Sequence, residues 1–176
     1  MDATKTFIKV YDITPQQAED FAYDYDISAS DLLTDLVPNL GHWGDLGWME
    51  LEDYEYNTHN HTMHISLETK WDSPLRWLQQ ASCDTPHFEN KLITMITIQK
   101  DETHAEGAAL MDGEILQNKT VWSVDQETVG KYYDDEQPDY DLDELDNKIW
   151  DSAGQFLSVC EKFYRPETED HENVDG

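Results

Sequence analysis

TMHISLETKWDSPLRWLQQ, residues 62–80, opens the stretch of sequence that decides the fold. Apolar and polar residues alternate over residues 63–69, which is the pattern of a strand with one buried face. Ser73 and Pro74 then predict the start of a helix, with Ser73 as the N-cap and Pro74 at the first helical position, where its missing N–H costs nothing. The sequence therefore predicts a strand followed directly by a helix.

The same stretch continues to Lys119 and completes a small α+β core. Leu75, Leu78 and Ala81 recur at helical spacing, so the predicted helix is amphipathic and is expected to lie on a sheet. A second strand is predicted over residues 92–98. Asp112-Gly113 predicts a two-residue hairpin turn, because both central positions need positive φ, which Gly, Asn and Asp adopt at low cost.

Similar patterns predict elements on both sides of this core. The predicted strands are Thr6–Tyr11, Trp48–Tyr56 and the short Thr120–Val124, and the predicted helices begin at Pro15, at Ser30 and at Leu142. At 176 residues the chain is long enough for one well-buried core. We expect an α+β domain over residues 1–131, an acidic connection with a C-terminal helix packed on the domain over residues 132–165, and a disordered acidic tail over residues 166–176.

Charge is the most informative property of the composition. The chain has 39 acidic and 11 basic residues, giving a formal net charge of −28. A nucleic-acid-binding protein needs an excess of Lys and Arg. We therefore expect this chain to bind neither nucleic acid directly nor an anionic membrane. A salt-adapted protein is expected to be poor in lysine, but nine of the basic residues here are lysines. Salt adaptation therefore explains the charge less well than a functional use does.

The sequence also indicates the compartment of the protein and the redox state of its cysteines. No apolar run approaches the roughly 20 residues of a membrane span, and the N-terminal residues do not have the pattern of a signal peptide. We therefore expect a cytoplasmic protein of the host cell. Cys83 and Cys160 have no metal-type spacing and are expected to be reduced thiols.

Chemistry-bearing clusters are few. His59, His61 and His64 are the one cluster of ligand-type residues close in sequence. If they lay on one strand, His64 would point away from the other two, so the three could not all face one metal ion. There is no phosphate-binding loop and no nucleophile elbow. The sequence therefore predicts no enzyme, no metal and no cofactor, with a metal-binding or hydrolytic use of the three histidines as a remaining alternative.

Carboxylates at regular spacing are the candidate binding groups. Alternate residues of a strand repeat at about 6.6 Å and residues one helical turn apart at about 5.4 Å, so that carboxylates can stand near the positions of phosphates in a nucleic acid. The candidate partner-binding residues are Glu50, Glu52, Asp134, Asp135, Glu136, Asp139 and Asp143, with Tyr132, Tyr133 and Tyr140 as aromatic anchors.

Several central segments also resemble a known family. The segments Leu67–Leu78, Pro86–Phe88, Ile96–Ile98, Ala105–Gly107 and Asp112–Glu114 resemble, in this order, the ferredoxin-like YubB family of plasmid and phage proteins. The turn at residues 101–104 departs from that pattern. The resemblance implies an α+β fold with helices on one face of an antiparallel sheet, in a protein of a mobile genetic element, and it implies no catalytic residues.

Charge and resemblance together predict an inhibitor. We expect a phage- or plasmid-encoded protein that imitates a nucleic acid and blocks the basic DNA or RNA channel of a host defence protein, such as a CRISPR effector or a restriction enzyme. The alternative is a non-catalytic interaction module that is acidic only for solubility and binds through the apolar loop His42–Trp48. Salt dependence of partner binding separates the two, because apolar contacts respond little to ionic strength.

Overall fold

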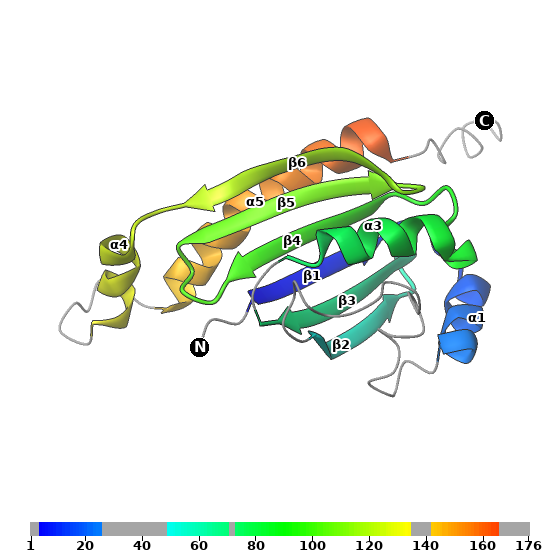
Figure 1. Cartoon of the computed structure of the whole chain (residues 1–176), viewed down its shortest axis with the longest axis horizontal. Helices are drawn as coiled ribbons and strands as arrows, with labels where there is room; N and C mark the ends of the chain where they lie inside the picture. The colour runs from blue at the N-terminus through cyan, green and yellow to red at the C-terminus, as the bar shows by residue number, and fades with distance from the viewer. Residues whose placement is uncertain (1–3, 26–48, 71–72, 135–141, 166–176) are drawn as a thin grey trace.

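A computed structural model describes residues 4–25, 49–70, 73–134 and 142–165 (Figure 1). The strands are β1 Thr4–Val10, β2 Met49–Asn57, β3 Thr62–Thr69, β4 Ile93–Gln99, β5 His104–Met111 and β6 Glu114–Ser123. The helices are α1 Pro15–Tyr25, α3 Leu75–Asp84, α4 Gln126–Gly130 and α5 Leu142–Tyr164, and the short 3-10 helices are η1 Pro86–Phe88 and η2 Lys131–Tyr133. The helix expected at Ser30, the loop His42–Trp48 and the tail lie outside the described residues.

All six strands form one antiparallel sheet in the order β2-β3-β1-β4-β5-β6. The first strand of the chain lies inside the sheet, where β1 is hydrogen-bonded to β3 on one side and to β4 on the other. β2 and β6 are the edge strands. The α+β class is therefore confirmed, although this sheet is larger than a typical ferredoxin-like sheet.

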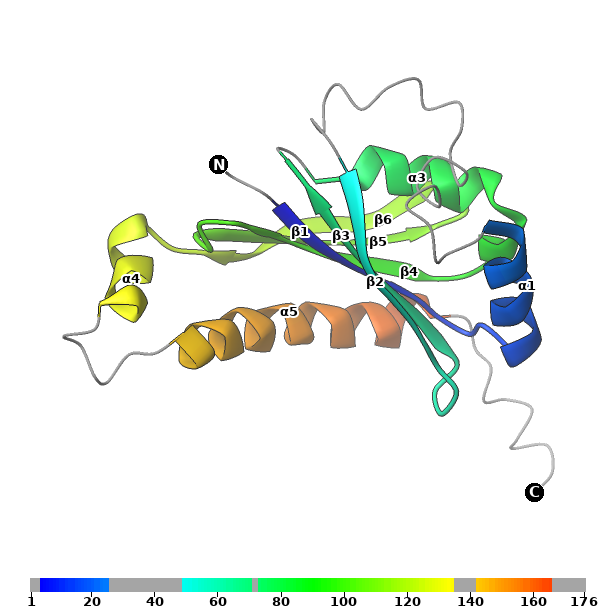
Figure 2. The ribbon, with the colours of Figure 1, turned by 90° about the horizontal axis from the view of Figure 1, so that it is seen from below.

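Helices cover both faces of this sheet (Figure 2). The helices α1 and α3 share one face, as expected for the helices of the core, whereas α5, for which no face was predicted, covers the other. Met95 of β4 packs with α3, whereas its neighbour Ile96 packs with α5. Residues 93–97 of β4 are accordingly all buried. A strand buried on both faces tends to be apolar along its length instead of alternating, and five of the seven residues from Leu92 to Ile98 are apolar.

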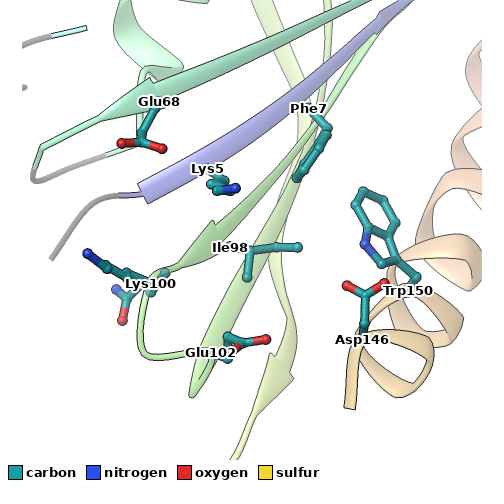
Figure 3. A pocket seen from close by; sticks show the side chains of 9 residues that line it. Lys5, Phe7, Glu68, Ile98, Lys100, Glu102, Asp146 and Trp150 are labelled. Carbon is teal, nitrogen blue, oxygen red and sulfur yellow. The ribbon is translucent and has the colours of Figure 1, made fainter. Parts of the chain in front are cut away.

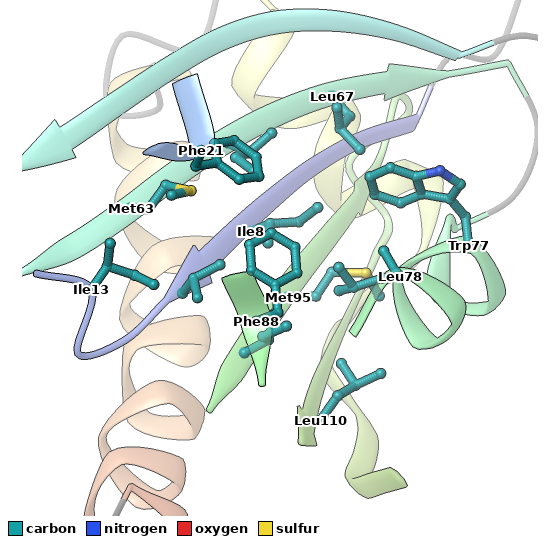
Figure 4. Close-up of a cluster of buried hydrophobic side chains, with 14 of the residues drawn as sticks. Ile8, Ile13, Phe21, Met63, Leu67, Trp77, Leu78, Phe88, Met95 and Leu110 are labelled. Atoms are coloured by element: carbon teal, nitrogen blue, oxygen red, sulfur yellow. The ribbon is translucent and has the colours of Figure 1, made fainter. Parts of the chain in front are cut away.

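One face carries the larger core, which α3 and α1 cover (Figure 4). Trp77 and Leu78 of α3 and Phe21 of α1 are at most 1 % exposed. They pack on residues that alternate along the central strands, including Ile8 and Met63. Fully burying such side chains contributes roughly 1.5–3 kcal/mol each, so this face supplies much of the stability.

The other face is covered by α5, whose predicted start at Leu142 is confirmed. Ala153, Phe156 and Cys160 of this helix are buried against the sheet. Phe156 lies directly over Gly107 of β5, and a Cβ atom at that glycine would come within 2.6 Å of the ring. The glycine therefore allows the helix to approach the sheet closely.

Local signals explain most element boundaries. Asp112 and Gly113 have φ values of 51° and 84° and form the predicted hairpin turn between β5 and β6. The helix α3 begins one residue later than predicted, with Pro74 as its N-cap and the Ser73 Oγ atom accepting a hydrogen bond from the Leu75 N–H. α4 was not predicted from the sequence, although Asp125 caps it by accepting a hydrogen bond from the Thr128 N–H.

Candidate functional site

Strand pairing places several carboxylates of the described residues at one end of the sheet. Thr4 is paired with Thr69 and with Gln99, and Met49 is also paired with Thr69. The start of β2 therefore lies at the same end as the turn after β4. We call this the acidic end; its exposed or half-buried carboxylates are Glu52, Glu68, Asp101, Glu102, Asp125, Glu127, Asp134, Asp143, Glu144 and Asp146.

The start of α5 is anchored at this end by a small apolar cluster. Leu145 and Ile149 are buried together with Ala105 of β5, Val129 of α4 and Tyr132 of η2. This packing holds the ends of the connection that carries Asp134 and Asp143. The helix dipole also favours the negative charges of Asp143 and Glu144 in the first turn of α5, because carboxylates there interact with unpaired N–H groups.

The predicted binding carboxylates fall into three groups. Glu52, Asp134 and Asp143 are exposed. The backbone of Glu50 is paired with Glu68 across β2 and β3, and nothing is described of its side chain. Asp135, Glu136, Asp139 and Tyr140 lie outside the described residues.

A β-bulge displays the carboxylates of β2. Leu51 is paired with Leu67 but Asp53 with Ser66, so Glu52 is an extra residue between them. An extra residue breaks the alternation of faces, and Glu52 and Asp53 are consequently both exposed. Sequence alternation alone could not show this irregularity.

The two predicted tyrosine anchors that the structure describes differ in position. Tyr132 is 6 % exposed and belongs to the apolar cluster, so it presents little surface to a partner. Tyr133 is 55 % exposed, and its hydroxyl donates a hydrogen bond to the Glu102 carboxylate. This bond and partial burial raise the pKa of Tyr133 to about 12. Tyr133 thus remains protonated and available as a surface anchor.

The opposite end of the sheet also carries carboxylates, but several of them are tied into internal contacts. The Lys9 Nζ atom and the Tyr11 hydroxyl both donate to Glu161, at 3.1 and 2.7 Å. Arg165 donates to Asp12 at 2.7 Å. Burial opposes ionisation of Glu161, but the hydrogen bonds from Tyr11 and Lys9 outweigh it and lower the pKa of this carboxyl. These contacts fix the end of α5 to β1.

A cavity of about 360 Å³ opens between α5 and the strands β1, β3 and β4 (Figure 3). Phe7, Ile98 and Trp150 form its apolar wall, and charged side chains surround them. The lining charged residues are Lys5, Glu68, Lys100, Glu102 and Asp146. Phe7, Glu102 and Trp150 were not among the candidates from the sequence, because β1, the turn after β4 and α5 are distant in the chain and only the fold brings them together.

The three histidines do not form a metal site in the described part of the chain. His59 and His61 are exposed in the turn between β2 and β3. His64 is half-buried with its Nε2 atom 3.1 Å from the Thr62 Oγ1 atom, and burial and the nearby Lys9 lower its pKa. Across the four described ranges, no three His, Cys, Asp or Glu side chains are grouped as metal ligands would be.

Within the same ranges, no helix combines the length and the apolar composition that a membrane span requires. Comparisons of the chain with models of protein families, with curated proteins and with solved structures found no match. Function is therefore inferred from the fold and from the geometry of the acidic end.

Proposed function

We propose that this chain is a non-catalytic, phage- or plasmid-encoded inhibitor that occupies the basic nucleic-acid channel of a host defence protein, such as a CRISPR effector or a restriction enzyme. The observation that supports this most is the assembly of the acidic end. Carboxylates from β2 and from the start of α5, about 90 residues apart in sequence, lie at one end of a single sheet.

The dimensions of this end suit an extended basic groove. Neighbouring strands are about 4.8 Å apart, so the six strands span roughly 24 Å from β2 to β6. Carboxylates occur along this span on β3, on the turn after β4 and on α5. A rigid sheet holds them in place, so that little side-chain ordering is needed when a partner binds.

Electrostatic attraction would set the kinetics of inhibition. A net charge of −28 produces a field that attracts a cationic groove over distances longer than any contact. Association is then fast at low salt and slows as salt screens the charges, with a Debye length of about 10 Å at 0.1 M. The inhibitor would compete with DNA or RNA for the same groove and would be released at high ionic strength.

Protection of phage in bacteria tests this function. The full chain is expressed in strains that carry one restriction or CRISPR system each, and the plating efficiency of a targeted phage is measured. We expect plating to rise in at least one strain. No rise in any strain would contradict the proposal.

A matched pair of variants tests the acidic end itself. The first variant neutralises the predicted group: Asp134→Asn, Asp135→Asn, Glu136→Gln, Asp139→Asn and Asp143→Asn. The control removes the same charge from exposed residues elsewhere: Glu19→Gln, Asp20→Asn, Asp84→Asn, Glu89→Gln and Glu114→Gln. Only the first variant is expected to lose protection, and equal protection by both variants would remove this segment from the proposal.

A further inference from the structure

The cavity beside α5 has a composition that suits a planar cation. Its apolar wall is aromatic, with Phe7 and Trp150 in edge-to-face contact at a centroid distance of 4.9 Å. Figure 3 shows Asp146 beside Trp150 on α5, with Phe7 and Ile98 facing them from the sheet. A flat group that enters the cavity can therefore lie against a ring and meet a carboxylate at the same time.

Trp150 offers an unused hydrogen-bond donor. Its indole N–H makes no hydrogen bond with the described part of the chain. By contrast, the indole N–H of Trp122 donates to the Glu102 carbonyl oxygen at 2.8 Å. A half-buried indole normally directs its N–H to a partner, so the free N–H of Trp150 is available to an acceptor on a bound molecule.

The charges of the cavity favour a cation over an anion. Glu68, Glu102 and Asp146 face two ammonium groups, those of Lys5 and Lys100, both of which belong to exposed residues. The surrounding protein has a net charge of −28 and repels anions. Two flexible lysines do not reverse that field.

We propose that this cavity binds the guanidinium group of an arginine from the partner. The planar group would stack against Trp150 and donate to Asp146, with Glu68 or Glu102 as a second acceptor, and the Trp150 N–H would donate to the backbone carbonyl of the same arginine. Arginine suits this arrangement better than lysine because its donors form a planar fork and its face stacks on aromatic rings. The inference rests on the proposed function, since a nucleic-acid channel is rich in arginine.

Small probes test the cavity without any partner. The full chain is titrated with N-acetylarginine amide, N-acetyllysine amide and adenosine monophosphate, and the indole N–H resonance of Trp150, assigned with Trp150→Phe, is followed by NMR. We expect a saturable shift with the arginine probe at a concentration several-fold lower than with the lysine probe, and no saturable shift with the nucleotide. Absence of a shift with arginine, equal binding of lysine, or tighter binding of the nucleotide would each overturn the proposal.

Two exposed aspartates of α5 provide the matched variants. Asp146→Asn removes a charged acceptor from the cavity and is expected to weaken arginine binding roughly tenfold. Asp151→Asn makes the same charge change on α5 outside the cavity lining and should leave affinity within about twofold. Equal loss of arginine affinity in the two variants would overturn the proposal, because it would mean that only net charge matters. Because these titrations use the chain alone, their failure removes the arginine site, whereas failure of phage protection removes the inhibitor function.

Discussion

At the scale of single residues, Gly107 shows how one missing side chain positions a helix. Gly107→Ala would place a Cβ atom 2.6 Å from the Phe156 ring, which is part of the buried contact between β5 and α5. Overpacking of this kind costs about 1–3 kcal/mol. We expect urea denaturation to show a loss of this size in the free energy of unfolding.

Gly154→Ala is the matched control for that variant. Gly154 lies within α5, and no atom lies within 4 Å of the position that a Cβ atom would take. Alanine is favoured over glycine in a helix by up to about 1 kcal/mol, so this variant should gain stability. A gain with Gly107→Ala as well would mean that the helix does not depend on close approach to the sheet.

The two cysteines differ in reactivity because they differ in burial. Cys160 is fully buried, and burial raises the pKa of its thiol to about 11, whereas Cys83 is exposed. Since the thiolate is the reactive form, a thiol reagent at pH 8 should label Cys83 quickly and Cys160 only in urea. Cys83→Ser is then expected to abolish fast labelling, and rapid modification of that variant would show that the C-terminal helix detaches from the sheet.

At the scale of elements, hydrophobic periodicity predicted a strand or helix correctly where that element buries one face. The alternation over residues 63–69 and the helical spacing from Leu142 gave the correct elements, and Asp112-Gly113 gave the correct turn. Thr120–Val124 was predicted as a separate short strand, whereas it continues the strand β6 that begins after the hairpin turn, because the polar sequence from Gln117 to Thr120 hides the continuity. Composition identifies a strand poorly when neither packing nor burial shapes it.

Arrangement was harder to predict than the elements themselves. The run from Leu92 to Ile98 was predicted only as a strand, and the sequence analysis did not show that helices cover it on both faces. α4 has only five residues, which is too short for a periodic signal. The cavity could not be predicted at all, because Phe7 and Trp150 meet only through the strand order.

The junction of α5 with β1 makes a prediction about pH. Glu161→Gln weakens the charged acceptor for Lys9 and Tyr11, and we expect a loss of about 1 kcal/mol at pH 7. Folding lowers the pKa of Glu161 below its usual value of 4.5. Its contribution is therefore present above that pH and is lost as the pH falls through the lower folded value.

Urea denaturation at pH 7, 5 and 3 measures this dependence. The difference in unfolding free energy between the wild-type chain and Glu161→Gln should persist at pH 5 and shrink at pH 3. Glu114→Gln, an exposed change of the same charge, should show little difference at any of these pH values. A difference for Glu161→Gln that grows on acidification would contradict the role of the ionised carboxylate.

At the scale of the whole molecule, net charge opposes folding. Carboxylates repel one another in the compact state, and a formal charge of −28 makes this cost large. Raising sodium chloride from 50 to 500 mM should therefore raise the melting temperature, by roughly 2–4 °C for each kcal/mol of repulsion that is screened. Calorimetry checks this, and a melting temperature that falls with salt would mean that attractive ion pairs dominate instead.

Composition predicted the kind of surface but not its layout. The 39 acidic residues could be counted from the sequence, whereas the neighbourhood of β2 and α5 depends on strand pairing over long sequence separations. The bulge at Glu52 and the burial of Tyr132 are likewise products of register and packing. For this reason the sequence indicated the net charge of the surface but not which carboxylates lie together.

The two edges of the sheet differ in a way that bears on aggregation. An exposed edge strand is a template on which further chains can assemble into fibrils. On β2 the bulge and the neighbouring carboxylates of Glu52, Asp53 and Glu55 repel an incoming copy. On β6 two register shifts divide the pairing with β5 into three short segments, of which the longest is Gln117 to Thr120. Open-ended pairing of edge strands is thus opposed by charge on one side and by irregular backbone on the other, so that the chain should stay dispersed even at high concentration.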